Sequence, residues 1–223
     1  MLWQPMSTGT EAARFESLWC RCVAAPDAAA PADAYADLCR RLGGPDRRFH
    51  DLDHIRDCLR WFDEVMPLLV HPDAVEVALW FHDAVYVPGD ADNELHSAEL
   101  FLAMTNGSES VFRRRVCGLI LTTRHQRPAR GNDRRFIEDI DLAGFGGSWE
   151  EFMRQGALLR EEFSAHSDAQ YHTGQVHFLD RLKRRPKFFS TAYFRDRYEA
   201  RAQENLDRLL ALLALQGYRP TSG

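Results

Sequence analysis

The sequence lacks the cysteine patterns that mark disulfide-linked or zinc-ribbon domains. Its five cysteines include no C-x-x-C pair and show no zinc-ribbon spacing. An odd number without a framework is typical of a reducing compartment, where most thiols behave as small buried hydrophobic groups. We therefore expect a cytoplasmic protein that builds its core without disulfides, and 223 residues are enough for this.

Long apolar runs and strand signals are missing as well. No window approaches ~18 continuous apolar residues, so no membrane span is expected. The first residues lack the basic and then apolar order of a secretory signal. No segment shows a convincing hairpin or internal repeat, which leaves helical periodicity as the main structural signal.

Charge of one sign is not dominant. A net charge of −5, with 45% hydrophobic and 27% charged residues, is ordinary for a globular protein and argues against stable nucleic-acid binding. Basic residues nevertheless cluster: 113–135 holds eight arginines and one acid, and RLKRRPK (181–187) holds five basic residues. Two interpretations stay open for these clusters, namely solvated faces and contacts to an anionic substrate.

Periodicity predicts an all-α, single-domain bundle of roughly eight to ten helices. The expected helical segments are 11–23, 34–44, 50–69, 71–86, 93–104, 108–125, 135–147, 148–164, 168–185 and 191–215. We place the domain at 10–215, with flexible ends at 1–9 and 216–223.

Ionisable residues occur inside three of the apolar segments. His50 and His54 are four positions apart on one predicted helix, so both face the same side. His82 and Asp83 follow Trp80 and Phe81 near the end of a strongly apolar helix, and Asp141 lies between Ile140 and Leu142. A carboxylate buried without a partner costs several kcal/mol. The pattern therefore predicts a buried divalent cation that neutralises these groups, with positions left open for water and substrate.

Several longer strings resemble the HD superfamily of metal-dependent phosphohydrolases, and in particular a predicted phosphohydrolase subfamily. The matching strings are RRFHDLDHI (47–55), WFHDAVYVPGDADNELHSA (80–98), TTRH (122–125), DIDLAGFG (139–146) and RAQENLDRLL (201–210). Phe49 stands where the subfamily usually has tyrosine, and Gly144 interrupts the usual aliphatic run. The resemblance implies an HD-type bundle with a buried metal site.

The resemblance also implies the ligand set: His54, His82, Asp83 and Asp141 would bind one divalent transition metal ion (Mn, Fe, Co, Ni or Zn, with Mg as a further candidate). Asp139 is the alternative to Asp141. Metal identity, the number of ions and the oligomeric state stay open, because His/Asp sets follow affinity order and availability more than identity.

Catalytic roles follow from the same resemblance. His50 would protonate the leaving oxygen as a general acid, or alternatively support His54 from behind. Glu94 would orient or deprotonate the attacking water, and Asp83 is counted as catalytic as well as a ligand.

Four further residues are candidates for binding the substrate. Arg47, Arg124 and His125 would hold phosphate oxygens. Arg124 and His125 have a second interpretation as a solvated helix end. Asn93 would contact substrate or else cap its helix.

The function expected from these residues is hydrolysis of a phosphomonoester or nucleotide-like phosphoester by a metal-activated water. The partner would be a small phosphorylated substrate. Two alternatives stay open: an HD-fold iron-dependent oxygenase, which needs additional histidines such as His96 or His125, and a non-catalytic nucleotide-binding module.

Overall fold

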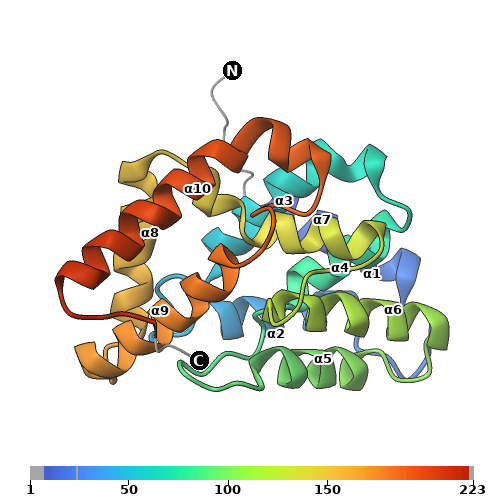
Figure 1. The fold of residues 1–223 in the computed structure, drawn as a ribbon. Helices are drawn as coiled ribbons and strands as arrows, with labels where there is room; N and C mark the ends of the chain where they lie inside the picture. The colour runs from blue at the N-terminus through green and yellow to red at the C-terminus, as the bar shows by residue number, and fades with distance from the viewer. Residues whose placement is uncertain (1–7, 24, 221–223) are drawn as a thin grey trace.

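The computed structural model describes residues 8–23 and 25–220, and every element within them is helical. The elements are α1 (Thr8–Cys22), α2 (Pro31–Leu42), α3 (Leu52–Val65), η1 (Met66–Leu68), α4 (Pro72–Phe81), α5 (Asn93–Met104), α6 (Ser110–Ile120), η2 (Leu121–Arg124), α7 (Asn132–Asp141), η3 (Ala143–Gly146), α8 (Trp149–Glu162), α9 (Asp168–Lys183) and α10 (Ala192–Leu215). Figure 1 shows their arrangement. The predicted all-α fold is confirmed.

Helix α4 is the centre of the bundle. All of Ala74–Phe81 is buried, because the segment is apolar on every side except at Glu76. Arg14 compensates that carboxylate with an ion pair at 2.6 Å. Helices α1, α3, α5, α6 and α7 all contact α4, so its C-terminal end is surrounded by other elements.

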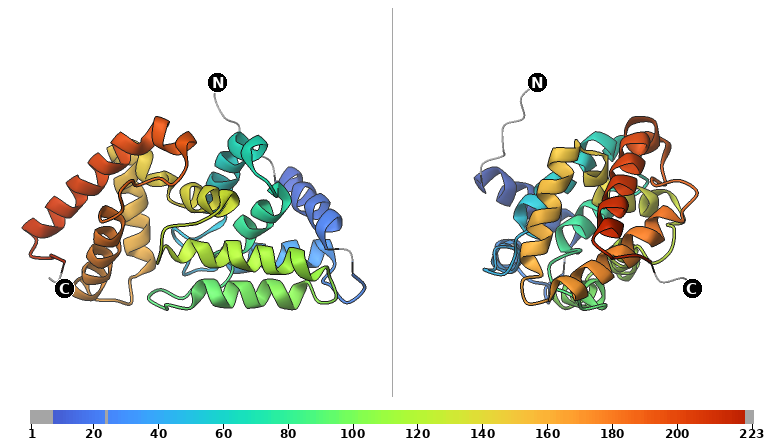
Figure 2. Two further views of the ribbon diagram at one scale, coloured as in Figure 1. Left: turned by 45° about the vertical axis from the view of Figure 1, so that its right-hand side comes forward. Right: turned by 60° about the vertical axis from the view of Figure 1, so that its left-hand side comes forward.

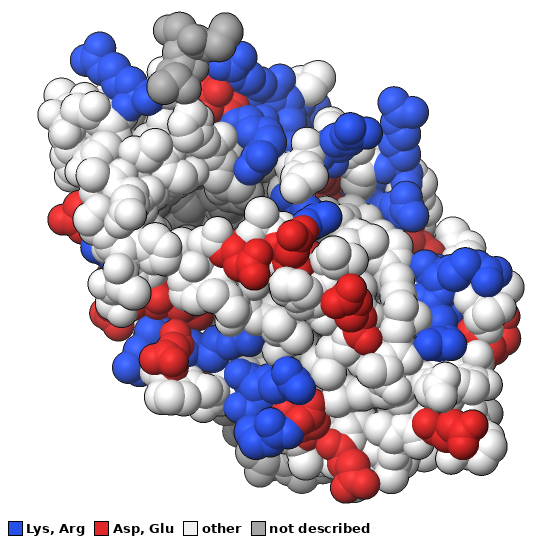
Figure 3. Space-filling model, turned by 90° about the horizontal axis from the view of Figure 1, so that it is seen from below, with Lys and Arg blue, Asp and Glu red and all other residues white. Residues whose placement is uncertain are grey.

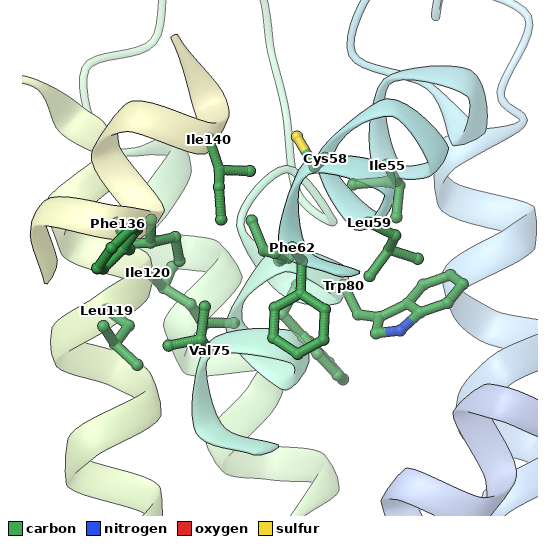
Figure 4. Packing of buried hydrophobic residues seen from close by; sticks show 14 of the residues in the cluster. Ile55, Cys58, Leu59, Phe62, Val75, Trp80, Leu119, Ile120, Phe136 and Ile140 are labelled. Carbon is green, nitrogen blue, oxygen red and sulfur yellow. The ribbon is translucent and has the colours of Figure 1, made fainter. Parts of the chain in front are cut away.

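The core beside this helix is built from large side chains of α3, α4, α6 and α7. Figure 4 shows Phe62 of α3 between Ile120 of α6 on one side and Trp80 of α4 on the other. Burying a side chain of this size stabilises the fold by about 1.5–3 kcal/mol. This packing fixes α3, α4 and α7 relative to one another.

Helices α8, α9 and α10 form the other end of the molecule (Figure 2). Helix α10 packs on α9 and on η3, the turn that follows α7. Asn205 of α10 donates hydrogen bonds to the carbonyls of Phe145 and Gly147, at 2.8 and 3.0 Å. The chain after Asp141 is thus held by hydrogen bonds from a residue 58 and 60 positions later in the sequence.

Several expected helix boundaries were wrong, and three of these errors concern site residues. Asp51 caps α3 by accepting hydrogen bonds from the amides of Asp53 and His54, so His50 precedes the helix. Helix α4 ends at Phe81, which places His82 at its C-cap. Helix α6 ends at Ile120 and passes into η2, after which His125 adopts a left-handed conformation with φ 51°.

The ends of the chain, expected to be flexible, are described only in part, so that expectation stays a prediction. Helix α1 begins at Thr8, inside the segment expected to be flexible, and residues 1–7 and 221–223 lie outside the described residues. Tyr218 packs against the core and its ring lies 4.8 Å from that of His172. The segment after Leu215 therefore returns to the body of the protein.

The described surface mixes both signs of charge. Basic and acidic side chains lie among one another on the face in Figure 3, with basic groups gathered along one part of it. No helix among the described residues combines the length and apolar character needed to cross a bilayer. The expectation against stable nucleic-acid binding stays a prediction.

Candidate metal centre

Four donor side chains from three segments meet inside the bundle. His54 lies in the first turns of α3, His82 and Asp83 follow the buried helix α4, and Asp141 is the last residue of α7. Because α3, α4 and α7 contact one another in pairs, their donors face a common space. The sequence-predicted set is therefore brought together by the fold.

The donor atoms lie at short and similar separations. His54 Nε2 is 3.3 Å from His82 Nε2, 3.2 Å from Asp141 Oδ1 and 3.5 Å from Asp83 Oδ2. His82 Nε2 is 3.0 Å from Asp83 Oδ2 and 3.4 Å from Asp141 Oδ1. Each of the two imidazole nitrogens thus lies within 3.5 Å of a carboxylate oxygen of Asp83 and of one of Asp141.

These separations fit one cation. Two ligands about 2.1 Å from one ion lie about 3.0 Å apart at right angles and about 3.4 Å apart at the tetrahedral angle. Asp83 Oδ2 is buried and faces the Nε2 atoms of His82 and His54 at 3.0 and 3.5 Å, so it has no hydrogen-bond donor while both nitrogens are unprotonated. A buried carboxylate oxygen without a donor is costly, and a cation bound between these residues would satisfy it.

The protein sets the tautomer of His82. Its Nδ1 donates to the Leu79 carbonyl at 2.8 Å, which leaves the lone pair of Nε2 facing the cluster. Burial alone lowers the pKa of His82, but Asp83 and Asp141 raise it well above the usual value. Burial likewise opposes ionisation of Asp83, yet His82 and its neighbours hold the pKa of that carboxyl far below its usual range. In a metal-free protein, protons would occupy the position that suits a cation.

Cys58 also faces the cluster, which the sequence did not lead us to expect. It lies one helical turn after His54, is 2% exposed, and its Sγ is 3.6 Å from His54 Nε2. Ligand atoms of His54, Cys58, His82 and Asp141 all lie within 4.8 Å of one another. The H-x-x-x-C spacing was the available signal.

His125 orients Asp141 from behind. Its Nε2 lies 2.7 Å from Asp141 Oδ2, the carboxylate oxygen turned away from His54. Its Nδ1 lies 3.9 Å from Glu138 Oε1, and Arg185 Nη1 lies 3.1 Å from the same oxygen. His125 is buried and committed to Asp141, which suits a positioning residue better than a phosphate contact.

The alternative ligand Asp139 faces elsewhere. Its carboxylate accepts hydrogen bonds from the amides of Ser190 and Thr191 and from the Thr191 hydroxyl, each at 2.7 Å. Burial raises the pKa of Asp139 to about 7, although these donors oppose the shift. Of the two acids in D-I-D, Asp141 is the one that points at the imidazoles.

Gly144 does not disturb this geometry. A Cβ at this position would come within 2.4 Å of Gln155 Oε1, so the end of that flexible side chain fills the space of the missing aliphatic group. Both residues line a cavity of about 250 Å³ that reaches His54, Cys58 and Asp141. Trp61 and Tyr198 contribute aromatic surface to its wall. The cavity connects the cluster with surrounding space.

His50 is held beside the cluster by a buried acid. Its Nδ1 lies 2.5 Å from Glu162 Oε2, and its ring stacks on Tyr86 with centroids 3.9 Å apart. Glu162 Oε1 accepts from the amides of Arg48 and His50, both at 3.1 Å. Its pKa is lowered because these donors outweigh the effect of burial. Sequence reasoning missed Glu162, since it is 112 positions from His50.

Glu94 and Arg124 form a second polar group near the donors. Arg124 Nε lies 3.6 Å from Glu94 Oε2, and Arg124 Nη2 donates to Asp92 Oδ1 at 2.5 Å. Burial and the neighbouring Asp83 raise the pKa of Glu94 above its usual value. A carboxyl whose pKa is raised suits proton transfer in this position, and the guanidinium beside it supplies positive charge.

Arg47 and Asn93 hold backbone. Arg47 Nη1 donates to the carbonyls of His50 and Asp83, at 2.8 and 2.9 Å, and so ties two segments of the site together. The Asn93 amide accepts from the Val87 amide and donates to the Val87 carbonyl, at 2.8 and 3.0 Å. Both contacts make these residues supports of the site, where we had expected contacts to substrate, with a helix cap as the alternative for Asn93.

Together the fold and the cluster define a helical bundle with an internal His/Asp site suited to one divalent cation. Comparisons of the chain with models of known protein families, with curated proteins and with solved structures gave no match. The functional argument therefore rests on the residues themselves and on the motif resemblance.

Proposed function

We propose that the protein is a cytoplasmic, metal-dependent phosphohydrolase of the HD type that cleaves a phosphomonoester or nucleotide-like phosphoester. The observation that carries the proposal is the convergence of His54, His82, Asp83 and Asp141 with one carboxylate oxygen left unbonded. When bound, a divalent cation lowers the pKa of a water molecule and polarises a phosphoryl oxygen. The chain's own residues supply the remaining steps.

His50 is the proposed general acid. Because Glu162 holds Nδ1, a proton on Nε2 can be delivered to the leaving oxygen. Stacking on Tyr86 fixes the plane of the ring. Glu162 places a carboxylate beside the ring, and its bond to His50 and the amides of Arg48 and His50 lower the pKa of that carboxyl.

Glu94 is the proposed contact of the attacking water, and Arg124 is the proposed contact of the phosphate oxygens. Glu94 would accept a proton from the attacking water, since its raised pKa brings it closer to neutrality. Arg124 would neutralise phosphate oxygens, exchanging its present contacts with Asp92 and Glu94 for the substrate.

One donor group among the described residues supports this function over two-iron oxidation. The described residues contain one cluster of three or more potential metal ligands, formed by His54, Cys58, His82 and Asp141. His96 lies beside Asp90 at 3.8 Å, and His125 is bonded to Asp141. Neither histidine forms a second set of ligands with further donors.

The test is phosphate release by purified protein loaded with Mn²⁺, Co²⁺, Ni²⁺ or Zn²⁺ and supplied with a panel of phosphomonoesters and nucleotides. We expect turnover with at least one pair, and a loss of 10²–10⁴-fold in His50→Ala. His177→Ala, at an exposed histidine, is the matched control and should retain the wild-type rate. Metal-loaded protein that releases no phosphate from any substrate would refute the proposal. Tight nucleotide binding in that case would indicate the binding module.

A further inference from the structure

Cys58 occupies a position that packing alone does not explain. Its helix buries Ile55, Leu59 and Phe62 against other apolar side chains. Cys58 belongs to the same core cluster, but its sulfur lies 3.6 Å from the donor atom of His54, and it also lines the cavity that reaches Asp141. The thiol therefore lies between the proposed ligands and the cavity.

The separation of the sulfur from His54 fits joint binding of one ion. A thiolate about 2.3 Å and an imidazole nitrogen about 2.1 Å from one tetrahedral cation lie about 3.6 Å apart. The observed distance between Cys58 Sγ and His54 Nε2 is 3.6 Å. Asp83 supplies the second, independent observation, because its Oδ2 is buried, aimed at the same two imidazoles and without a hydrogen bond.

We propose that Cys58 Sγ is a ligand of this site together with His54, His82 and Asp141, whose ligand atoms all lie within 4.8 Å of one another, and that the site selects a thiolate-binding cation such as Zn²⁺ or Co²⁺ over Mg²⁺ or Mn²⁺. The inference rests on the metal site of the proposed function and deepens it. Thiolate is a soft ligand that favours zinc-like ions, whereas oxygen ligands suit magnesium and manganese. Binding requires the thiol to lose its proton, which passes to solvent as the metal–sulfur bond forms.

Cobalt spectroscopy tests this ligand directly. Wild-type protein titrated with Co²⁺ should develop a thiolate-to-cobalt charge-transfer band in the near ultraviolet, besides visible ligand-field bands. Cys58→Ser should bind one Co²⁺ without the charge-transfer band. Its affinity for Zn²⁺ should fall about tenfold or more, with Mn²⁺ affinity changed less than threefold.

Cys117→Ser is the matched control. Cys117 is half-buried in α6, and its Sγ lies 4.0 Å from the Ala98 carbonyl. This variant should keep the wild-type spectrum. X-ray absorption of the cobalt-loaded wild-type protein needs no substitution and should show one sulfur in the first coordination shell, so the test survives if Cys58→Ser fails to fold.

The outcomes separate this inference from the proposed function. Bound cobalt without a sulfur ligand overturns the role of Cys58, even if phosphoesters are hydrolysed. A sulfur ligand without turnover of any phosphoester supports Cys58 and refutes the hydrolase. Wild-type protein that binds no cobalt or zinc overturns both.

Discussion

Replacing His125 with alanine is expected to weaken metal binding while the bundle remains folded. His125 contacts no proposed ligand other than Asp141, whose Oδ2 lies 2.7 Å from its Nε2. Without this partner the carboxylate can rotate away from His54 and His82. Its Oδ2 would also be left in a buried environment without a donor.

The magnitude follows from that single contact. Removing a residue that orients a metal ligand typically costs 10–100-fold in affinity, which is about 1.4–2.7 kcal/mol. The metal-free protein should lose a similar amount of stability, about 1.5–3 kcal/mol, because the broken hydrogen bond involves a charged acceptor. Both losses are small enough to leave most molecules folded.

Isothermal titration with Co²⁺ or Zn²⁺ measures the loss of metal affinity, and urea unfolding of the metal-free protein measures the loss of stability. His125→Gln returns an N–H donor to about the same place and should recover part of the affinity. His177→Ala, at an exposed histidine, should change neither quantity. Wild-type metal affinity in His125→Ala, under conditions where Asp141→Asn loses binding, would show that His125 does not position the ligand.

Two further perturbations test the acid behind His50 and the core. The pKa of Glu162 is lowered from an ordinary 4.5, so its stabilisation is present above that pH and is lost as the pH falls through the folded-state value. Glu162→Gln should therefore flatten the loss of stability below about pH 4.5 in urea titrations across pH 3–7, and an unchanged slope would contradict the assignment. Phe62→Ala, at a side chain 1% exposed, should cost about 3–5 kcal/mol of unfolding free energy, whereas Leu215→Ala, at one 85% exposed, should change it by less than about 0.5 kcal/mol. Equal losses of unfolding free energy in these two variants would show that Phe62 is not a core residue.

Local sequence signals anticipated the helical fold and the four donors now seen together. Periodicity located the helices, and the apolar run 74–81 marked the central one, because a segment hydrophobic on all sides must be surrounded. The donors were singled out because His82, Asp83 and Asp141 lie among residues that belong in a core. The start of α3 was harder to predict from the sequence. The Asp51 side chain accepts hydrogen bonds from the first free amides of the helix, so the helix begins after Asp51 and His50 lies outside it.

The sequence by itself determined that the helices of this protein would bury imidazoles and carboxylates, since spacing along a helix fixes which residues share a face. Only the tertiary structure decided their partners. It placed Glu162 behind His50 and His125 behind Asp141. Both contacts join residues from different elements, so they depend on how helices pack, and no local pattern encodes that packing.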